Sequence, residues 1–202
     1  MRPIPLAGVA ALALSACATP PIDASGTGTG PLAEALLARD AHPARVSDLG
    51  LYGRFVGHWD FRVENHPDNG PVVEGEGEWV FGWALEGRAI QDVWIVPGRD
   101  RRDARAPAPG PIGTTLRFPE PGKASWQVIW ANPVSNTVLR MSAREVAGEI
   151  VQEGRDDEGQ AFRWIFHDIA SDSFRWRAEE LGADGRWKLR QRMQVRRRFA
   201  GR

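Results

Sequence analysis

The chain has little of what most chemical sites are built from. A single cysteine among 202 residues excludes a disulfide framework and any metal site made of several cysteines. Lys and Arg together number 26, as do Asp and Glu, so the basic surface that nucleic-acid binding usually needs is missing. Nine tryptophans and 42% hydrophobic residues are nonetheless enough for a folded core, and the length fits one main domain.

Familiar catalytic motifs are missing from the sequence as well. No serine lies in Gly-x-Ser-x-Gly, and no glycine-rich phosphate loop occurs. The four histidines, His42, His58, His66 and His167, show no metal-binding spacing. We therefore name no catalytic residue, no metal ligand and no cofactor, and we favour a protein that is not an enzyme.

The first 16 residues are typical of a lipoprotein signal peptide. Ile4 to Ala16 is an almost wholly apolar run, too short for a membrane span of about 20 residues. It ends in Leu14-Ser15-Ala16-Cys17, which resembles a bacterial lipobox, so we predict lipidation of Cys17 and a membrane anchor. Because Ala18 follows in place of an aspartate, the motif resembles those of outer-membrane lipoproteins that face the periplasm. The alternative is an ordinary secretory signal that is cleaved after Ala16.

Residues 17–47 are predicted to connect this anchor to the folded body. The stretch 18–30 consists almost wholly of Pro, Gly, Ser, Thr and Ala and is typical of a flexible tether. Pro31 to Asp40 has apolar residues near helical spacing, with a proline at a favourable first position. We expect one short helix there, ending before His42-Pro43 and serving as a plug or lid on the domain.

From about Leu49 onward apolar and polar residues alternate, which is typical of half-buried β-strands. Turn signals such as Asp184-Gly185 separate the alternating segments. The ten predicted strands are Phe55–Val63, Gly75–Trp83, Arg88–Val96, Gly113–Phe118, Ser125–Ala131, Thr137–Glu145, Glu149–Arg155, Phe162–Ile169, Ser173–Leu181 and Trp187–Arg197.

Short connections between these strands predict an antiparallel meander, since a parallel sheet would need crossover helices. A meander with one apolar and one charged face removes its edges most simply by closing on itself. We therefore predict an all-β fold, an up-and-down antiparallel barrel of about ten strands spanning residues 48–199, with a short helix before it. Gly75 and Gly77 on the apolar face fit a barrel corner.

Gly57-His58-Trp59 on the first predicted strand resembles the opening of the calycins, the superfamily of lipocalins and fatty-acid-binding proteins. In those barrels an arginine of the last strand commonly packs over this tryptophan. The resemblance implies structural roles for Gly57 and Trp59 and for an arginine such as Arg190 or Arg192. Further segments are similar to uncharacterised bacterial lipocalin-like domains: Trp83–Trp94, Gly113–Phe118, Ser173–Arg177 and Asp184–Trp187. The resemblance implies a barrel and brings no established activity. Ten predicted strands and a cysteine-free domain depart from the lipocalin pattern.

The inward face of the predicted barrel is rich in aromatic side chains, as in pockets that hold small apolar ligands. Polar residues at inward positions would orient such a ligand or hydrogen-bond among themselves. A shift of one residue in the strand 88–96 would turn Asp92 and Trp94 inward in place of Gln91. The candidate ligand-binding residues are Trp79, Phe81, Trp83, Gln91, Trp126, Trp130, Arg140, Phe166, Asp168, Trp176 and Gln191.

These patterns favour a lipid-anchored protein of the bacterial cell envelope whose barrel binds a small apolar or amphipathic ligand. A structural or protein-interaction barrel with a filled core is the alternative. A calycin-type cyclase or isomerase using Asp168 has less support, because carboxylates at inward positions are scarce. A haem-binding barrel also has less support, because His167 falls on the predicted outer face. Outward arginines are expected to pair across strands. The arginine-rich segment 97–111 is either disordered or a lid that attracts anionic groups.

Overall fold

The structure is a computed structural model and describes residues 30–102 and 110–199. The signal peptide and the lipidation site Cys17 lie outside these residues, so both stay predictions. Within the two described stretches, none of the helices combines the length and the apolar character that a membrane crossing requires.

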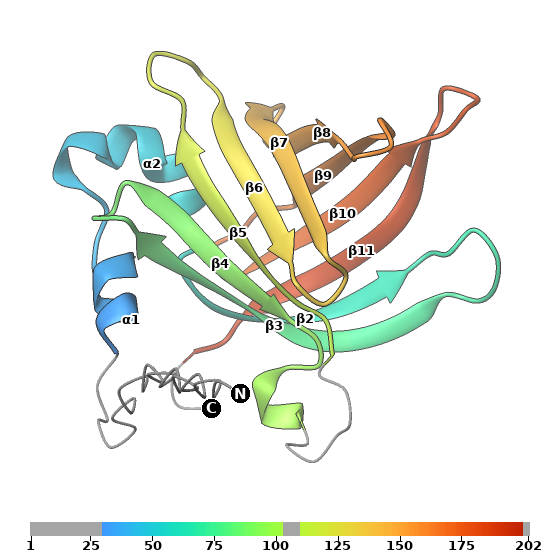
Figure 1. Ribbon diagram of the computed structural model, residues 1–202, viewed down its shortest axis with the longest axis horizontal. Coiled ribbons are helices and arrows are strands. Elements are labelled where there is room, and N and C mark those ends of the chain that lie inside the picture. The colour runs from blue at the N-terminus through green and yellow to red at the C-terminus, as the bar shows by residue number, and fades with distance from the viewer. Residues whose placement is uncertain (1–29, 103–109, 200–202) are drawn as a thin grey trace, which may run out of the picture.

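Ten antiparallel strands close into a barrel, as the alternation predicts (Figure 1). Each strand pairs with its neighbour in the chain, and pairing of the first barrel strand with the last completes the ring. The barrel strands are β2 (Gly57–Asn65), β3 (Val73–Ala84), β4 (Ala89–Ile95), β5 (Ile112–Pro119), β6 (Trp126–Asn132), β7 (Thr137–Val146), β8 (Glu149–Arg155), β9 (Ala161–His167), β10 (Ser173–Leu181) and β11 (Trp187–Arg197). A two-residue strand, β1 (Leu37–Ala38), adds to the outside of β3.

The helices differ from the prediction. The expected helix forms only as α1 (Pro31–Leu36), which buries none of its residues and therefore does not plug the barrel. A short 3₁₀ turn (Pro43–Arg45) leads instead into a second helix, α2 (Val46–Gly53), where strand-like alternation was expected from Leu49. This helix covers one end of the barrel (Figure 1).

The half of the interior next to α2 is a packed core. Leu49 and Tyr52 of the helix and Phe55 just after it are completely buried against rings from the barrel wall. Gly77 on β3 has the role expected of a barrel corner, because a Cβ there would lie 2.4 Å from the ring of Phe61. Van der Waals contact and burial of these rings supply the main stabilisation of this end.

The calycin-like signature is present, but with a different arginine. Trp59 is fully buried on β2, and the guanidinium of Arg197 on β11 lies over its ring. Gly57 is required in the same cluster, since its φ is +133° and a Cβ would lie 2.6 Å from Nη1 of Arg197. The expectation for Arg190 and Arg192 was wrong: both lie on the outer face and pair with Glu180 and Glu64.

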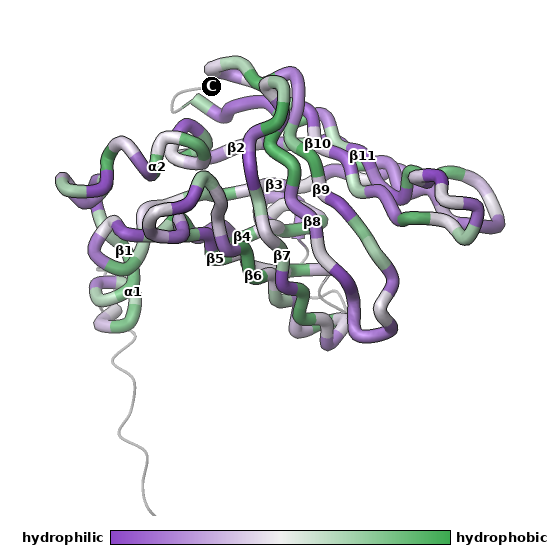
Figure 2. The backbone as a smooth tube through the Cα atoms, turned by 90° about the horizontal axis from the view of Figure 1, so that it is seen from above, coloured by the Kyte–Doolittle hydropathy of each residue, from purple (hydrophilic) through white to green (hydrophobic). Residues whose placement is uncertain are grey.

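The outer face carries the charged residues and their ion pairs. Arg177 of β10, for example, donates to Glu179 on the same strand and to Glu149 on β8. Viewed from above, the hairpin of β10 and β11 extends away from the end that α2 covers (Figure 2). The ring of Trp187 near its tip packs outside the barrel against the guanidinium of Arg163, 4.2 Å away, which itself pairs with Glu179.

Candidate functional site

The half of the interior that α2 does not fill contains a pocket of about 200 Å³, which we call the tryptophan pocket. Alternation along the strands brings its side chains inward from seven of the ten barrel strands, and Pro111 stands at its edge. The lining residues are Trp79, Trp94, Pro111, Thr115, Trp130, Asn132, Trp164, Trp176, Gln191 and Met193.

Five indoles form the wall of this pocket through edge-to-face contacts. Trp130 packs against Trp94 at 6.2 Å and against Trp164 at 5.7 Å between ring centroids. Trp164 continues to Trp176 at 5.5 Å, and Trp176 to Trp79 at 6.3 Å. Trp79 and Trp94 are directly opposite one another on β3 and β4, so the five residues follow one another around the pocket. The rings are therefore held by one another and by the strands, and they form a rigid wall.

Three polar atoms of residues that line this pocket have no hydrogen-bond partner among the described residues. The indole nitrogens of Trp79 and Trp176 and the hydroxyl of Thr115 are all buried and unpartnered. Gln191, in contrast, donates to Asn65 at 2.6 Å, and Trp94 donates to the sulfur of Met193 at 3.5 Å. Buried polar groups in folded proteins nearly always have partners, so these three atoms are the groups of the lining residues to which a bound molecule could offer acceptors.

A buried ion pair adjoins the pocket on the side of α2. Asp92 on β4 and Arg117 on β5 are almost fully shielded from solvent and contact each other through a side-chain hydrogen bond. The guanidinium also lies 5.1 Å from the ring centroid of Tyr52, and burial raises the pKa of that tyrosine. Gln152 of β8 is buried as well, with its amide unpartnered. The two residues neutralise each other, so the pair adds no net charge to the interior.

The sequence-predicted residues divide into three groups. Trp79, Trp130, Trp176 and Gln191 lie together in the pocket. Phe81, Trp126 and Phe166 belong to the packed core near α2, and Trp83 packs against Gly53 of that helix. Gln91, Arg140 and Asp168 do not face the interior.

The physical reasons for these three errors differ. Register places Asp92 and Trp94 beside the inward residues of β3, so Gln91 lies on the outer face, where it donates to Thr114. Arg140 is exposed because Leu139 and Met141 take the inward positions of β7. Asp168 lies beyond the end of β9 with a φ of +49°, and it is exposed.

Sequence reasoning missed Trp164 as a pocket residue, and it missed the buried role of Arg117. The inward parity of Trp164 was visible beside Phe162 and Phe166, so this residue could have been found. An arginine at an inward position carries no such signal, because arginines are mostly exposed.

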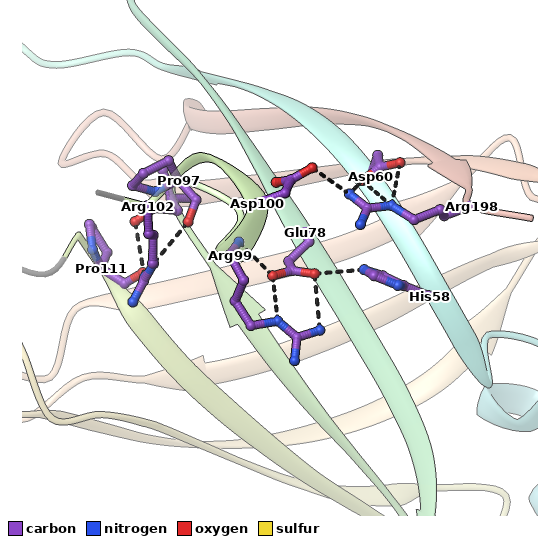
Figure 3. Close-up of polar contacts among 10 residues, drawn as sticks. His58, Asp60, Glu78, Pro97, Arg99, Asp100, Arg102, Pro111 and Arg198 are labelled. Atoms are coloured by element: carbon purple, nitrogen blue, oxygen red, sulfur yellow. Dashed lines mark hydrogen bonds and ion pairs between the residues drawn. The ribbon is translucent and has the colours of Figure 1, made fainter. Parts of the chain in front are cut away.

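At the other end of the barrel, the start of the segment 97–111 is fixed to the outer wall (Figure 3). Glu78 on β3 is buried and accepts hydrogen bonds from the backbone and side chain of Arg99, both at 2.7 Å, and contacts His58 at 2.6 Å. Arg99–Arg101 forms a 3₁₀ turn, and Arg102 donates to the carbonyls of Pro97 and Pro111. Of the two alternatives for this segment, disorder is therefore wrong for residues 97–102. Residues 103–109 lie outside the described part.

Burial alone would raise the pKa of the Glu78 carboxyl, but the hydrogen bonds from Arg99 and His58 outweigh this effect. The pKa of Glu78 is lowered to about 2. The carboxylate therefore stays charged, and it ties the turn Arg99–Arg101 to the barrel wall.

Two wider clefts on the outer face are charged and differ in kind from the tryptophan pocket. One, of about 500 Å³, lies beside Asp60, Asp100 and Arg198, and the other, of about 920 Å³, beside Glu64, Arg177 and Arg192. The six residues just named all take part in ion pairs, such as Arg198 with Asp60 and Arg192 with Glu64. No group of three or more potential metal-ligating side chains occurs in the described residues.

Comparison with known proteins supports the fold alone. No family model and no curated protein matches the sequence. Among solved structures, the chain is similar to Rv2717c from M. tuberculosis, with a TM-score of 0.54 and 13% identity over 79% of this chain and 100% of that one. It is also similar to the S-type phycobiliprotein lyase CpeS from Guillardia theta, with a TM-score of 0.52 and 13% identity over 77% and 95%. Both are ten-stranded calycin-like barrels, so the predicted fold is confirmed.

Proposed function

We propose that this protein is a lipid-anchored protein of the bacterial envelope whose barrel binds a small apolar or amphipathic molecule. One observation carries the binding proposal: about 200 Å³ of space is lined by five indoles and three unpartnered buried polar atoms. A barrel that served only as a solid scaffold would fill this space with side chains, as the half beside α2 does.

The size of the pocket limits the ligand. An apolar cavity of about 150 Å³ is enough for benzene, so a pocket of about 200 Å³ suits one or two rings. Pockets for larger ligands usually have about 300–1,000 Å³. Haem would exceed the available space, and none of the four histidines lines the pocket, all four being described in the structure. These observations favour a compact ligand over haem.

The CpeS comparison bears on this proposal only through its barrel. That protein is by its name a phycobiliprotein lyase. At 13% identity we carry over neither the activity nor the substrate. The proposal rests on the pocket itself.

Binding is tested first by native mass spectrometry of protein extracted from the envelope, and then by titration of tryptophan fluorescence. We expect a co-purifying small molecule and a fluorescence change with small aromatic compounds. Gln191→Phe, which brings a ring to the pocket wall, should abolish the change. Trp187→Phe, on the outer face against Arg163, is the matched control and should leave it intact.

The filled-core alternative makes the opposite prediction. The complete packing around Tyr52 and Phe55 favours it for one half of the barrel. If neither a bound molecule nor any fluorescence change is found, the protein is a structural or interaction barrel, and the binding proposal is wrong.

The anchor is tested separately, because it depends on Cys17 alone. We expect incorporation of a fatty-acid label and recovery in the outer-membrane fraction, and both should be lost in Cys17→Ala. Release of the wild-type protein as a soluble, unlabelled chain cleaved after Ala16 would show an ordinary secretory signal and contradict the anchor.

A further inference from the structure

The described residues that line the tryptophan pocket carry no charge. Among the described residues, its polar side chains are limited to Thr115, Asn132, Gln191 and the indole N–H groups. The nearest buried charges on the neighbouring strands are those of Asp92 and Arg117, which neutralise each other. An ionised ligand group would therefore leave water for a site with no free counter-charge, at a large cost in free energy.

The unpartnered atoms at the wall are mainly donors. An indole nitrogen donates and cannot accept, and both Trp79 and Trp176 leave this donor without a partner although their side chains are 3% and 4% exposed. Thr115 is completely buried, and its hydroxyl is also free to donate. The donors of Trp59 and Trp94 provide the contrast, because each already has a partner: the carbonyl of Phe55 at 2.6 Å and the sulfur of Met193. The occupant must therefore bring acceptors.

The shape of the wall favours a flat occupant. Adjacent indoles stand nearly perpendicular, at 85° between Trp79 and Trp176 and 79° between Trp130 and Trp164. Such a wall offers both ring faces and ring edges to a planar molecule, which is the arrangement that aromatic rings prefer.

We propose that the occupant is an uncharged, flat molecule of one or two rings that carries a carbonyl oxygen, of the aryl-ketone or quinone type. Its oxygen accepts hydrogen bonds from the donor set Trp79, Trp176 and Thr115, and its rings contact the other indoles. This inference rests on the proposed ligand-binding function and narrows the class of ligand. Carboxylates such as fatty acids are poor ligands for the same pocket, because none of its described lining residues is a cation.

Three probes of similar shape separate these properties: acetylnaphthalene, ethylnaphthalene and naphthoate. They present a neutral acceptor, no acceptor and a charged acceptor. Calorimetric titration of the full-length protein in detergent should give a Kd for acetylnaphthalene at least about ten-fold below that of ethylnaphthalene, since two or three hydrogen bonds of about 0.5–1.5 kcal/mol each favour the ketone. Naphthoate should bind more weakly than both.

The donors are tested by Trp79→Phe, Trp176→Phe and Thr115→Val, each of which removes one donor and keeps an apolar side chain. The readout is the Kd of ethylnaphthalene divided by the Kd of acetylnaphthalene. A change in pocket shape affects both probes of similar shape, so this ratio reports the hydrogen bonds to the ketone. Each variant should lower this ratio by about three- to ten-fold. Trp83→Phe is the control, because Trp83 lies outside the pocket against Gly53, and the ratio should not change.

The outcomes distinguish this inference from the proposal on which it rests. Equal binding of the ketone and the hydrocarbon overturns the inference and leaves the ligand-binding function in place. If naphthoate binds more tightly than the other two probes, the inference is also overturned and the ligand-binding function stays in place. A ratio that the three variants leave unchanged shows that their donors do not hold the carbonyl. If no probe binds, both the inference and the binding function are wrong.

Discussion

The guanidinium of Arg197 lies 4.0 Å from the ring centroid of Trp59, and the two residues are directly opposite one another on β11 and β2. The same guanidinium donates to the carbonyls of Arg54, Val56 and Ser171, at 2.9 to 3.0 Å. One side chain thus joins the last strand, the first strand and the segment that leaves α2. These contacts of Arg197 hold β11 and β2 together at the end of the barrel that α2 covers.

Replacement of Arg197 should therefore destabilise the protein strongly. We expect Arg197→Met to lower the free energy of unfolding by about 2–4 kcal/mol, because the cation–π contact and three hydrogen bonds to carbonyls are lost together. Chemical denaturation measures the difference. Arg192→Met is the matched control on the same strand, where the loss of an exposed pair with Glu64 should change stability little. Similar losses in the two variants would show that Arg197 has no special role.

The fully buried Leu49 makes α2 part of the core. We expect Leu49→Ala to lower the free energy of unfolding by about 2–5 kcal/mol, because the completely buried side chain leaves a cavity between the helix and the barrel. Leu32→Ala in α1 makes the same chemical change at a side chain that is 79% exposed, and it should cost less than about 0.5 kcal/mol. A small effect at Leu49 would mean that α2 can detach without loss of the core.

The sequence was sufficient to predict the barrel because apolar and polar residues alternate without interruption along its first two strands. On β3, Gly77, Trp79 and Phe81 all face inward and the glutamates face outward, as predicted. The alternation was less informative where both faces of a strand carry apolar residues. Beside Arg140, Val138 is apolar yet 56% exposed, so the wrong face was chosen. A shift of one residue reverses every side chain, which is how Gln91 was placed inside.

Other features depend on tertiary contacts that local patterns do not contain. Leu49, Tyr52 and Phe55 follow one another at intervals of three, a helical spacing that was overlooked because it leads directly into a strand. Arg197, and not Arg190 or Arg192, reaches Trp59 because strand register decides which arginine stands opposite it. Register in a closed barrel follows from ten pairings together, so the sequence could not identify this arginine.

The ion pair between Asp92 and Arg117 leads to a prediction that a double variant can test. Asp92→Leu or Arg117→Met alone leaves the other charge buried without its partner, and each should lower the free energy of unfolding by about 3–5 kcal/mol. The double variant Asp92→Leu/Arg117→Met should recover most of this loss, because an apolar pair fills the same space without a desolvation cost. Chemical denaturation of the four proteins forms a double-mutant cycle. Additive losses would contradict a coupled buried pair.

Glu78 should make stability depend on pH in the acid range. Its pKa is about 2 in the folded protein against an ordinary value of 4.5, so the unfolded chain takes up the proton first. The stabilisation is complete above about pH 4.5 and is lost as the pH falls toward 2, and it amounts to at most about 3 kcal/mol. Glu78→Gln lacks this carboxylate. The advantage of the wild-type protein over the variant should therefore shrink between pH 5 and about pH 2, as thermal or chemical unfolding can measure.

A matched variant separates this effect from the general consequence of removing a negative charge. Glu74→Gln changes an exposed carboxylate on the same face of β3, and its stability relative to wild type should vary little over the same pH range. Loss of the Arg99–Glu78 bonds should also free the turn Arg99–Arg101, which hydrogen exchange of its amides would detect. If Glu78→Gln and Glu74→Gln show the same pH dependence, Glu78 is not held as a buried carboxylate, and the segment 97–102 is attached to the barrel by other contacts.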